Sequence, residues 1–329
     1  NMDIIDKLLL LHEKYYSINL VNRQVTKKYR KKSQMIPWVY AHGMFILAQW
    51  LLYFVLKLKY KYDNRLPICG GGNLAVSLTS YPPRIGNLWM TIHSLFRQTI
   101  LPGHIVLYLS HEDFPKGKED LPETLLWFEY YGLEIKFVED NIRSHKKYYY
   151  MMQEHPDWDV ITVDDDIYYR KDLVEQLLRL HSLKSKAVCA NQVAELPISK
   201  EDFANYASWK SCYLKKPNFS YRYVAIGCGG ILYPSGIFHF SDQVFDKECI
   251  LENALSADDL WLKAHEINAG VGVMANTFYS CSPLIPSSQA SALYHVNCEG
   301  ENKNNKVWRI LSDIYKLRDK IQMLCDKNK

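Results

Sequence analysis

Hydrophobic and polar positions follow a regular alternation of two patterns over residues 74–190. Short apolar runs with β-branched residues predict strands at 74–79, 104–109, 134–138, 159–163 and 186–190. Longer stretches between them, with apolar residues three or four positions apart, predict helices near 86–98, 120–131, 145–154 and 171–183. Strands that alternate with helices predict an α/β fold, a mostly parallel sheet with helices on both faces.

Two more helices are predicted before this region, over residues 2–30 and 36–58. The second, IPWVYAHGMFILAQWLLYFVLKL, has no formal charge before Lys57 and is long enough to span a bilayer. However, four polar residues share one narrow stripe on it, and lipid on all sides would give no reason to keep them: His42, Gln49, Tyr53 and Lys57. A helix attached to a membrane surface, or packed on the protein or on a second subunit, is therefore favoured over a true span.

The stretch DNRLPICGGGN, residues 63–73, has the proline and glycine content of a domain boundary. A last helix is predicted at 305–325, with its apolar residues on one side. The expected organisation is thus an N-terminal helical segment at 1–66, a catalytic α/β domain at 67–304 and a C-terminal helix at 305–329.

Charge is distributed unevenly along the chain. Residues 1–66 carry 12 Lys/Arg against 4 Asp/Glu, including the cluster KKYRKK at 27–32, while the rest carries 28 against 32. The eight cysteines form no CxxC pair, and no secretory signal pattern is found. We expect a cytoplasmic protein, at the inner face of the membrane if the N-terminal segment attaches there. A homo-oligomer is left open, and no nucleic-acid partner is expected.

The stretch VITVDDDIYY, residues 160–169, runs a buried strand directly into three aspartates. Adjacent carboxylates repel one another unless a cation lies between them. Ligands of α/β sheets bind beyond the carboxyl ends of the strands, and carboxylate oxygens suit Mg²⁺ or Mn²⁺. The alternative is an acidic helix N-terminus capped by Asp166 or Asp172.

The triplet resembles the DXD motif of nucleotide-sugar-dependent glycosyltransferases with the GT-A (Rossmann-like) fold, and the similarity runs from about residue 73 to 298. The opening SLTSYPPRIGNLWMTIHSLFRQTILPGHIVLYLS, residues 77–110, resembles the first strand, nucleotide-binding turn, helix and second strand of bacterial members. The resemblance implies Asp164 and Asp166 as metal ligands, with Asp164 and Asp165 also at the donor.

Other residues match the family in order along the chain. The resemblance implies that the nucleoside contacts four residues after the first strand: Thr79, Ser80, Tyr81 and Arg84. It implies that Lys146 and Lys147 lie near the diphosphate. In the glycine-rich loop AIGCGGILYPSGIF, it places Gly229 and Gly230 under the donor sugar. The alternatives are an ordinary turn at SYPPR and solvated lysines.

SADDLWLKAHE, residues 256–266, resembles the acidic pair of inverting members of the family. The resemblance implies Asp259 as general base and Asp258 as a ligand of acceptor or donor hydroxyls. Helix capping by Ser256 or Asp258 is the alternative. The resemblance also implies His295 as a third metal ligand.

The resulting hypothesis is a Mn²⁺- or Mg²⁺-dependent, inverting glycosyltransferase. It moves a sugar from a nucleotide donor, expected to be UDP-linked, to a glycan or lipid-linked glycan of a bacterial surface polysaccharide or lipopolysaccharide. Two rivals are a nucleotidyltransferase, although SLTSYPPR lacks a glycine-rich phosphate loop, and an inactive polysaccharide-binding or assembly protein.

Overall fold

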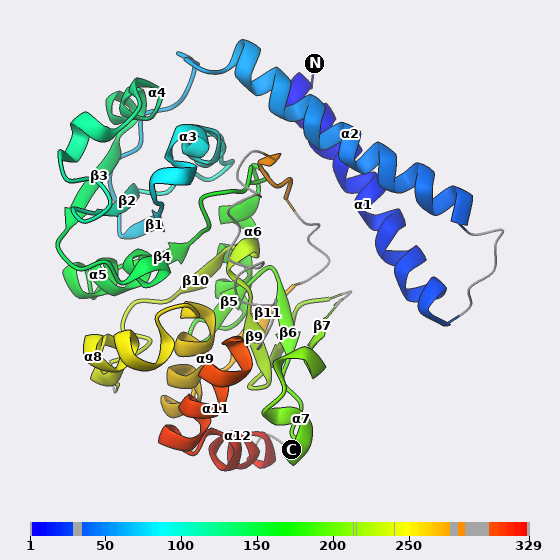
Figure 1. Ribbon diagram of the computed structural model, residues 1–329, viewed down its shortest axis with the longest axis vertical. Coiled ribbons are helices and arrows are strands. Elements are labelled where there is room, and N and C mark those ends of the chain that lie inside the picture. The colour runs from blue at the N-terminus through cyan, green and yellow to red at the C-terminus, as the bar shows by residue number, and fades with distance from the viewer. Residues whose placement is uncertain are drawn as a thin grey trace.

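The computed structural model describes residues 2–28, 35–212, 214, 216–239, 241–276, 282–286 and 303–327. Its centre is an eight-stranded sheet in the order β3-β2-β1-β4-β10-β5-β11-β8 (Figure 1). The strands are β1 (Leu74–Thr79), β2 (His104–Ser110), β3 (Leu133–Val138), β4 (Asp159–Thr162), β5 (Val188–Ala190), β8 (Asn218–Ser220), β10 (Ile231–Tyr233) and β11 (Val273–Ala275). β10 and β8 run antiparallel to their neighbours, and the other pairings are parallel. The predicted mostly parallel α/β sheet is confirmed.

Helices cover both faces of the sheet. α3 (Pro82–Phe96) and α6 (Leu173–Leu183) pack on one face, and α5 (Lys146–Glu154) and α9 (Asp258–Asn268) pack on the other. The side chains of β1 alternate accordingly, because successive residues of a strand point to opposite faces. Val76 and Leu78 join the core under α3, whereas Ala75 joins Met151 of α5.

Three predicted elements differ in detail. The helix predicted at 120–131 is a series of short turns, Gly117–Asp120, α4 (Glu123–Leu126) and Trp127–Tyr131, interrupted at Pro122 and ended by Gly132 with φ 100°. The helix predicted from residue 86 begins at Pro82, since proline is well suited to the first helical turn. The C-terminal helix is divided into α11 (Lys303–Tyr315) and α12 (Leu317–Asp326) at Lys316, which has φ 53°.

The loops between β5 and α9 carry elements that the hydrophobic pattern did not predict. β6 (Val193–Glu195), β7 (Lys210–Ser211) and β9 (Tyr223–Ala225) form a second, three-stranded sheet. The short helices α7 (Lys200–Phe203) and α8 (Lys247–Cys249) lie in the same part of the chain, and α8 continues into a π-helical turn at Ile250–Ala254. Strands of two or three residues are too short for a period to be visible in the sequence.

α1 (Ile4–Lys28) and α2 (Met35–Lys59) form a helical hairpin that extends away from the sheet (Figure 1). At its base, side chains of both helices enter the core beneath α3, namely Ile5, Leu9, Leu52 and Leu56. The base therefore belongs to the same hydrophobic core as the sheet, although the predicted domain boundary falls between them. The distal half of the hairpin stands apart from the body.

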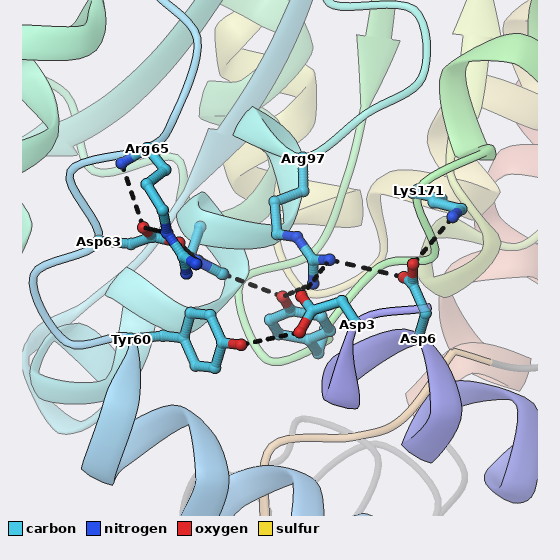
Figure 2. Close-up of polar contacts among 9 residues, drawn as sticks. Asp3, Asp6, Tyr60, Asp63, Arg65, Arg97 and Lys171 are labelled. Atoms are coloured by element: carbon cyan, nitrogen blue, oxygen red, sulfur yellow. Dashed lines mark hydrogen bonds and ion pairs between the residues drawn. The ribbon is translucent and has the colours of Figure 1, made fainter. Parts of the chain in front are cut away.

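A polar network fixes this base to the body (Figure 2). Asp3 accepts hydrogen bonds from Tyr60 at 2.8 Å and from Arg97 at 2.9 Å, which links α1 to the end of α2 and to the end of α3. Lys171 donates to Asp6 at 2.9 Å. Because these contacts come from sequence positions far apart, they hold the hairpin in one orientation relative to the sheet.

Candidate active site

The candidate site lies at the carboxyl ends of β1 and β4, which are neighbouring parallel strands. In the order β3-β2-β1-β4, β2 and β3 lie one after the other on one side of β1, and β4 lies on the other side of β1. The chain thus reverses its direction of winding between β1 and β4, and ligands of open α/β sheets bind at such a switch point. Ser80 follows β1 there, and Asp164–Asp166 follow β4.

One cluster of charges is centred on the buried side chain of Lys147 from α5. Its ammonium lies 2.9 Å from Asp164 Oδ1 and 3.0 Å from Asp258 Oδ2. Burial alone would lower the pKa of Lys147, but Asp164, Asp258 and Asp259 together raise it well above its usual range. Lys147 is therefore permanently charged and joins the end of β4 to the start of α9.

Asp258 and Asp259 are the first two residues of α9, and their pKa values are shifted in opposite directions. Burial would raise the pKa of Asp258, but Lys147 and His145 overcome that effect and lower it to about 2. Burial and the negative charge of Asp258 raise the pKa of Asp259 to about 8. One carboxylate stays ionised while its neighbour exchanges a proton near neutral pH, which is the pattern expected of an acid–base pair.

Gly227 brings the glycine-rich loop against these carboxylates. Its N–H donates to Asp259 Oδ2 at 3.3 Å. A Cβ atom at this position would lie 3.2 Å from Asp164 Oδ1 and 3.4 Å from Asp259 Oδ1. Gly227 therefore lies between the end of β4 and the start of α9, where the backbone approaches both carboxylates.

Gly229 and Gly230, the two glycines predicted to lie under a donor sugar, are in close packing contacts. A Cβ at Gly229 would meet Gln192 at 2.9 Å, and one at Gly230, where φ is 76°, would meet Leu173 of α6 at 2.8 Å. These neighbours leave no room for a Cβ at either position, and the predicted place of both glycines under a donor sugar stays a prediction.

Alanine substitutions are expected to separate the roles of these glycines. Gly227→Ala should fold normally but lower turnover about tenfold or more, because the new methyl displaces the Asp164 and Asp259 carboxylates by a few tenths of an ångström. Gly230→Ala should instead destabilise the fold by on the order of 2 kcal/mol, through its left-handed backbone and the overlap with Leu173.

Thermal melting and turnover of the two variants, with Gly70→Ala as control, measure this difference. A Cβ at Gly70 has no neighbour within 4 Å, so that variant should match the wild type. Full activity of Gly227→Ala would remove Gly227 from the site.

A second cluster forms around Arg84 at the start of α3. Arg84 donates to Asp165 at 2.5 Å and lies 3.2 Å from Asp166, and Ser80 donates to Asp165 at 2.6 Å. Burial raises the pKa of Asp165, although Arg84 opposes this. The guanidinium also lies 5.6 Å from the ring centroid of Tyr81. The structure thus joins Ser80, Tyr81 and Arg84 to the aspartate triplet.

Two further predicted site residues, Lys146 and Thr79, do not contact the two carboxylate clusters, and a third cannot be placed. Lys146 points away from Lys147 and donates to Asn141 at 2.8 Å, close to Asp113. Burial lowers the pKa of Lys146 to about 8. Thr79 has a buried hydroxyl without a hydrogen-bond partner within the described part of the chain. His295 lies outside the described residues.

Several neighbours of the site were not predicted from the sequence. The hydroxyl of Tyr169 accepts the Asp164 N–H at 2.9 Å and so orients the chain as it leaves β4. His145 is fully buried between Tyr148 and the carbonyl of Ala254, 2.9 Å from each. Asp113, which accepts from Ser110 at 2.7 Å, lies at the carboxyl end of β2. The only sequence signals were the repeated tyrosines of DDDIYY and the polar residues after each strand.

The carboxylates fit a cation that is shared with a substrate. Within the described residues, no three His, Cys, Asp or Glu side chains form a group that could enclose a metal ion. Asp164 nevertheless keeps 32% of its side chain exposed beside Lys147, and Asp166 lies two residues further along. Mg²⁺ typically binds through one or two protein carboxylates together with substrate phosphates, so this donor set suits such an ion.

No protein-family model and no curated protein matches the chain. Among solved structures, TarS 1–349 from S. aureus aligns at 10% identity, TM-score 0.41, over 74% of this chain and 72% of that chain. Its complex with UDP aligns at 10% identity, TM-score 0.40, over 73% and 70%. The mannosyltransferase PcManGT from Pyrobaculum calidifontis, in complex with GDP-Man and Mn²⁺, aligns at 10% identity, TM-score 0.35, over 95% and 98%. Likeness at this level carries no argument about function.

Proposed function

We propose that the chain is a glycosyltransferase that moves a sugar from a nucleoside diphosphate to an acceptor hydroxyl. The observation that carries the proposal is the convergence of Asp164, Lys147, Asp258 and Asp259 at the carboxyl end of β4. Transfer of a sugar requires charge stabilisation at the leaving diphosphate and a base for the acceptor. This cluster provides a cation, a partly exposed carboxylate and a carboxylate with a pKa near neutral.

The nucleoside is proposed to lie over the ends of β1 and β2. Ser80, Tyr81 and Arg84 border this edge, with Tyr81 partly exposed and available to stack on a base. Asp113 and Asn141 lie beyond β2 and β3, where Asn141 donates to Asp113 at 3.1 Å and Asp113 keeps a second carboxylate oxygen as an acceptor. Because these strands are parallel and adjacent, all five residues lie along one edge of the sheet. A UDP-linked donor remains our preferred assignment.

Asp164 and Asp166 are the residues that would hold a Mn²⁺ or Mg²⁺ ion. When bound, such an ion neutralises charge on the departing diphosphate. Lys147 adds a fixed positive charge next to Asp164, and it keeps Asp258 ionised. Arg84 holds Asp165 and thereby fixes the backbone of the triplet.

Asp259 is proposed to remove the proton of the acceptor hydroxyl, and Asp258 to bind hydroxyls of the acceptor or donor sugar. Attack on the face opposite the leaving diphosphate inverts the anomeric centre. The proposed acceptor is a glycan or lipid-linked glycan of a bacterial surface polysaccharide, the class implied by the resemblance of the motifs.

A donor screen tests this function. The full chain is incubated with UDP- and GDP-sugars, Mn²⁺ and candidate glycans, and the release of UDP or GDP is measured. A nucleotidyltransferase would instead release pyrophosphate from a nucleoside triphosphate. If no nucleotide is released and calorimetry detects no UDP binding with Mn²⁺, the glycosyltransferase proposal fails.

A further inference from the structure

The face of α2 that points away from α1 is apolar and exposed. Helix α2 packs on α1 through one side, where Ala41, Ala48, Leu52 and Leu56 are buried. Five large apolar residues of the opposite side are at least 42% exposed: Val39, Ile46, Leu47, Trp50 and Phe54. At 3.6 residues per turn, they fall in a sector of about 100°. Monomeric soluble proteins rarely expose a continuous apolar stripe of this kind.

This stripe continues into a basic pocket at the end of the helix. Lys57 lies in the same sector as Trp50 and Phe54, one further turn along α2. Lys57, Lys61 and Tyr62 line an open pocket of about 500 Å³ that is bordered by α3 and α4, with Asn87 and the carboxylate of Glu123 among its other lining residues. Neither lysine forms an ion pair with an acidic side chain in the part of the chain that the structure describes. An anionic group that enters beside the stripe therefore meets two ammonium groups whose contacts are with aromatic rings, Lys57 at 4.6 Å from the ring centroid of Tyr53 and Lys61 at 5.6 Å from that of Tyr62.

The hairpin geometry excludes a simple membrane span. Val39–Lys59 is long and apolar enough to cross a bilayer, and 22% of its most apolar window is buried. However, α1 lies alongside α2 (Figure 1), so a crossing would also carry the Lys7, Glu13 and Lys14 side chains of α1 into hydrocarbon. Each such charge costs about 3 kcal/mol at the bilayer centre. An orientation along the membrane surface keeps those charges in water and buries only the stripe.

The charges also argue against a second copy of this chain as the occupant. α2 contains no acidic residue, and basic residues lie at both of its ends: the cluster KKYRKK at 27–32 before it, and Lys57, Lys59 and Lys61 after its apolar run. If two α2 stripes packed antiparallel, the start of α2 in one copy, which directly follows the basic cluster in the sequence, would approach the lysines of the other. If they packed parallel, identical basic ends would meet. Both arrangements bring like charges together, whereas anionic lipid headgroups attract both ends.

We propose that the exposed stripe of α2 lies on an anionic phospholipid surface, with a lipid phosphate in the pocket formed by Lys57 and Lys61. Trp50 and Phe54 insert at the level of the headgroups, where aromatic rings are favoured. Lys57 and Lys59, at the C-terminal end of the helix, lie against anionic headgroups. The network of Asp3, Tyr60 and Arg97 then fixes the sheet relative to the membrane. This inference does not depend on the reaction proposed for the site.

Vesicle flotation of the full chain tests the proposal. The vesicles are phosphatidylcholine with 30% phosphatidylglycerol, or phosphatidylcholine alone. Wild type should float with the anionic vesicles, and at least about tenfold less with neutral vesicles or in 0.5 M salt. Lys57→Glu with Lys61→Glu should lower flotation at least about tenfold, and so should Leu47→Ser with Trp50→Ser and Phe54→Ser.

Matched variants elsewhere on the surface serve as controls. Lys116→Glu with Lys186→Glu changes the net charge by the same amount as the double lysine variant of the pocket. Tyr130→Ser with Leu183→Ser and Met323→Ser removes three exposed apolar side chains outside α2. Both should float like wild type, and circular dichroism verifies that every variant is folded. The proposal is overturned if wild type stays at the bottom at low salt, or if the controls lose as much flotation as the α2 variants. Light scattering measures the oligomeric state of wild type and of the α2 stripe variant. The proposal is also overturned if wild type is a dimer while the variant is a monomer that binds vesicles as well as wild type does.

Discussion

Asp164→Asn is expected to reduce sugar transfer by on the order of 10³ while leaving the fold intact. The carboxylate is the most exposed of the triplet, and it is the only one that faces Lys147 and Asp259. Its removal takes away a negative charge that would help to hold a divalent cation next to the diphosphate. Lys147 keeps its second partner, Asp258, 3.0 Å away, so the start of α9 stays in place. Calorimetric titration with UDP should show that Mn²⁺ no longer strengthens binding.

Asp166→Asn should give the same loss of metal-dependent UDP binding, because both residues are proposed as ligands. Asp165→Asn is the matched control within the triplet. Its carboxylate is buried against Arg84 and Ser80, so its replacement should lower stability by about 3–5 kcal/mol with a smaller effect on the metal dependence. Full activity of Asp164→Asn, or full wild-type activity in EDTA, would contradict the assignment.

The first four strands of the sheet and the position of the aspartate triplet could be predicted from the sequence. Val76, Leu78, Ile105 and Leu107 belong to runs that are apolar at nearly every position, as expected of strands buried on both faces. The rule that ligands bind beyond the carboxyl ends of parallel strands then placed Asp164–Asp166 correctly at the sheet edge. The small sheet of β6, β7 and β9 could not be predicted, since its short strands are formed by contacts across the loops.

Side-chain direction was the part of the site that the sequence left open. Lys146 and Lys147 are adjacent in α5, about 100° apart around the helix, and only the packing of α5 on β1 decides which one enters the cluster. The structure turns Lys147 toward Asp164 and Lys146 toward Asn141. The three glycines of the GCGG stretch are equally ambiguous in the sequence, and only Gly227 contacts the carboxylates.

The different pKa values of Asp258 and Asp259 could not be predicted from the sequence either. The pair resembles a capping motif as much as a catalytic one, since both residues lie in the first turn of α9. The difference between their pKa values depends on Lys147, which is more than 100 residues away in the chain and forms an ion pair with Asp258 but not with Asp259. Burial and the negative charge of Asp258 then raise the pKa of Asp259, against the opposing effect of the Gly227 N–H, and leave it as the member whose proton is exchangeable near neutral pH.

Asp259→Asn is expected to lower turnover by on the order of 10² or more, with donor affinity nearly preserved. Asparagine keeps the size of the side chain and can still accept the Gly227 N–H, but it cannot take up a proton. Asp258→Asn provides the comparison. It removes a permanent partner of Lys147, so it should weaken substrate binding and stability as well as turnover. If Asp258→Asn preserved binding and stability but lost more turnover, the base would be Asp258.

The pH dependence provides an independent test of the same assignment. Because the pKa of Asp259 is raised to about 8, the side chain is mostly protonated below that pH and cannot act as a base. The kcat/KM of the wild type should therefore rise with pH, by up to tenfold per pH unit, and level off above about pH 8. Asp259→Asn should lose this rising limb, whereas Gly70→Ala should keep it. A rising limb that persists unchanged in Asp259→Asn, or a product that retains the anomeric configuration of the donor, would exclude Asp259 as the general base.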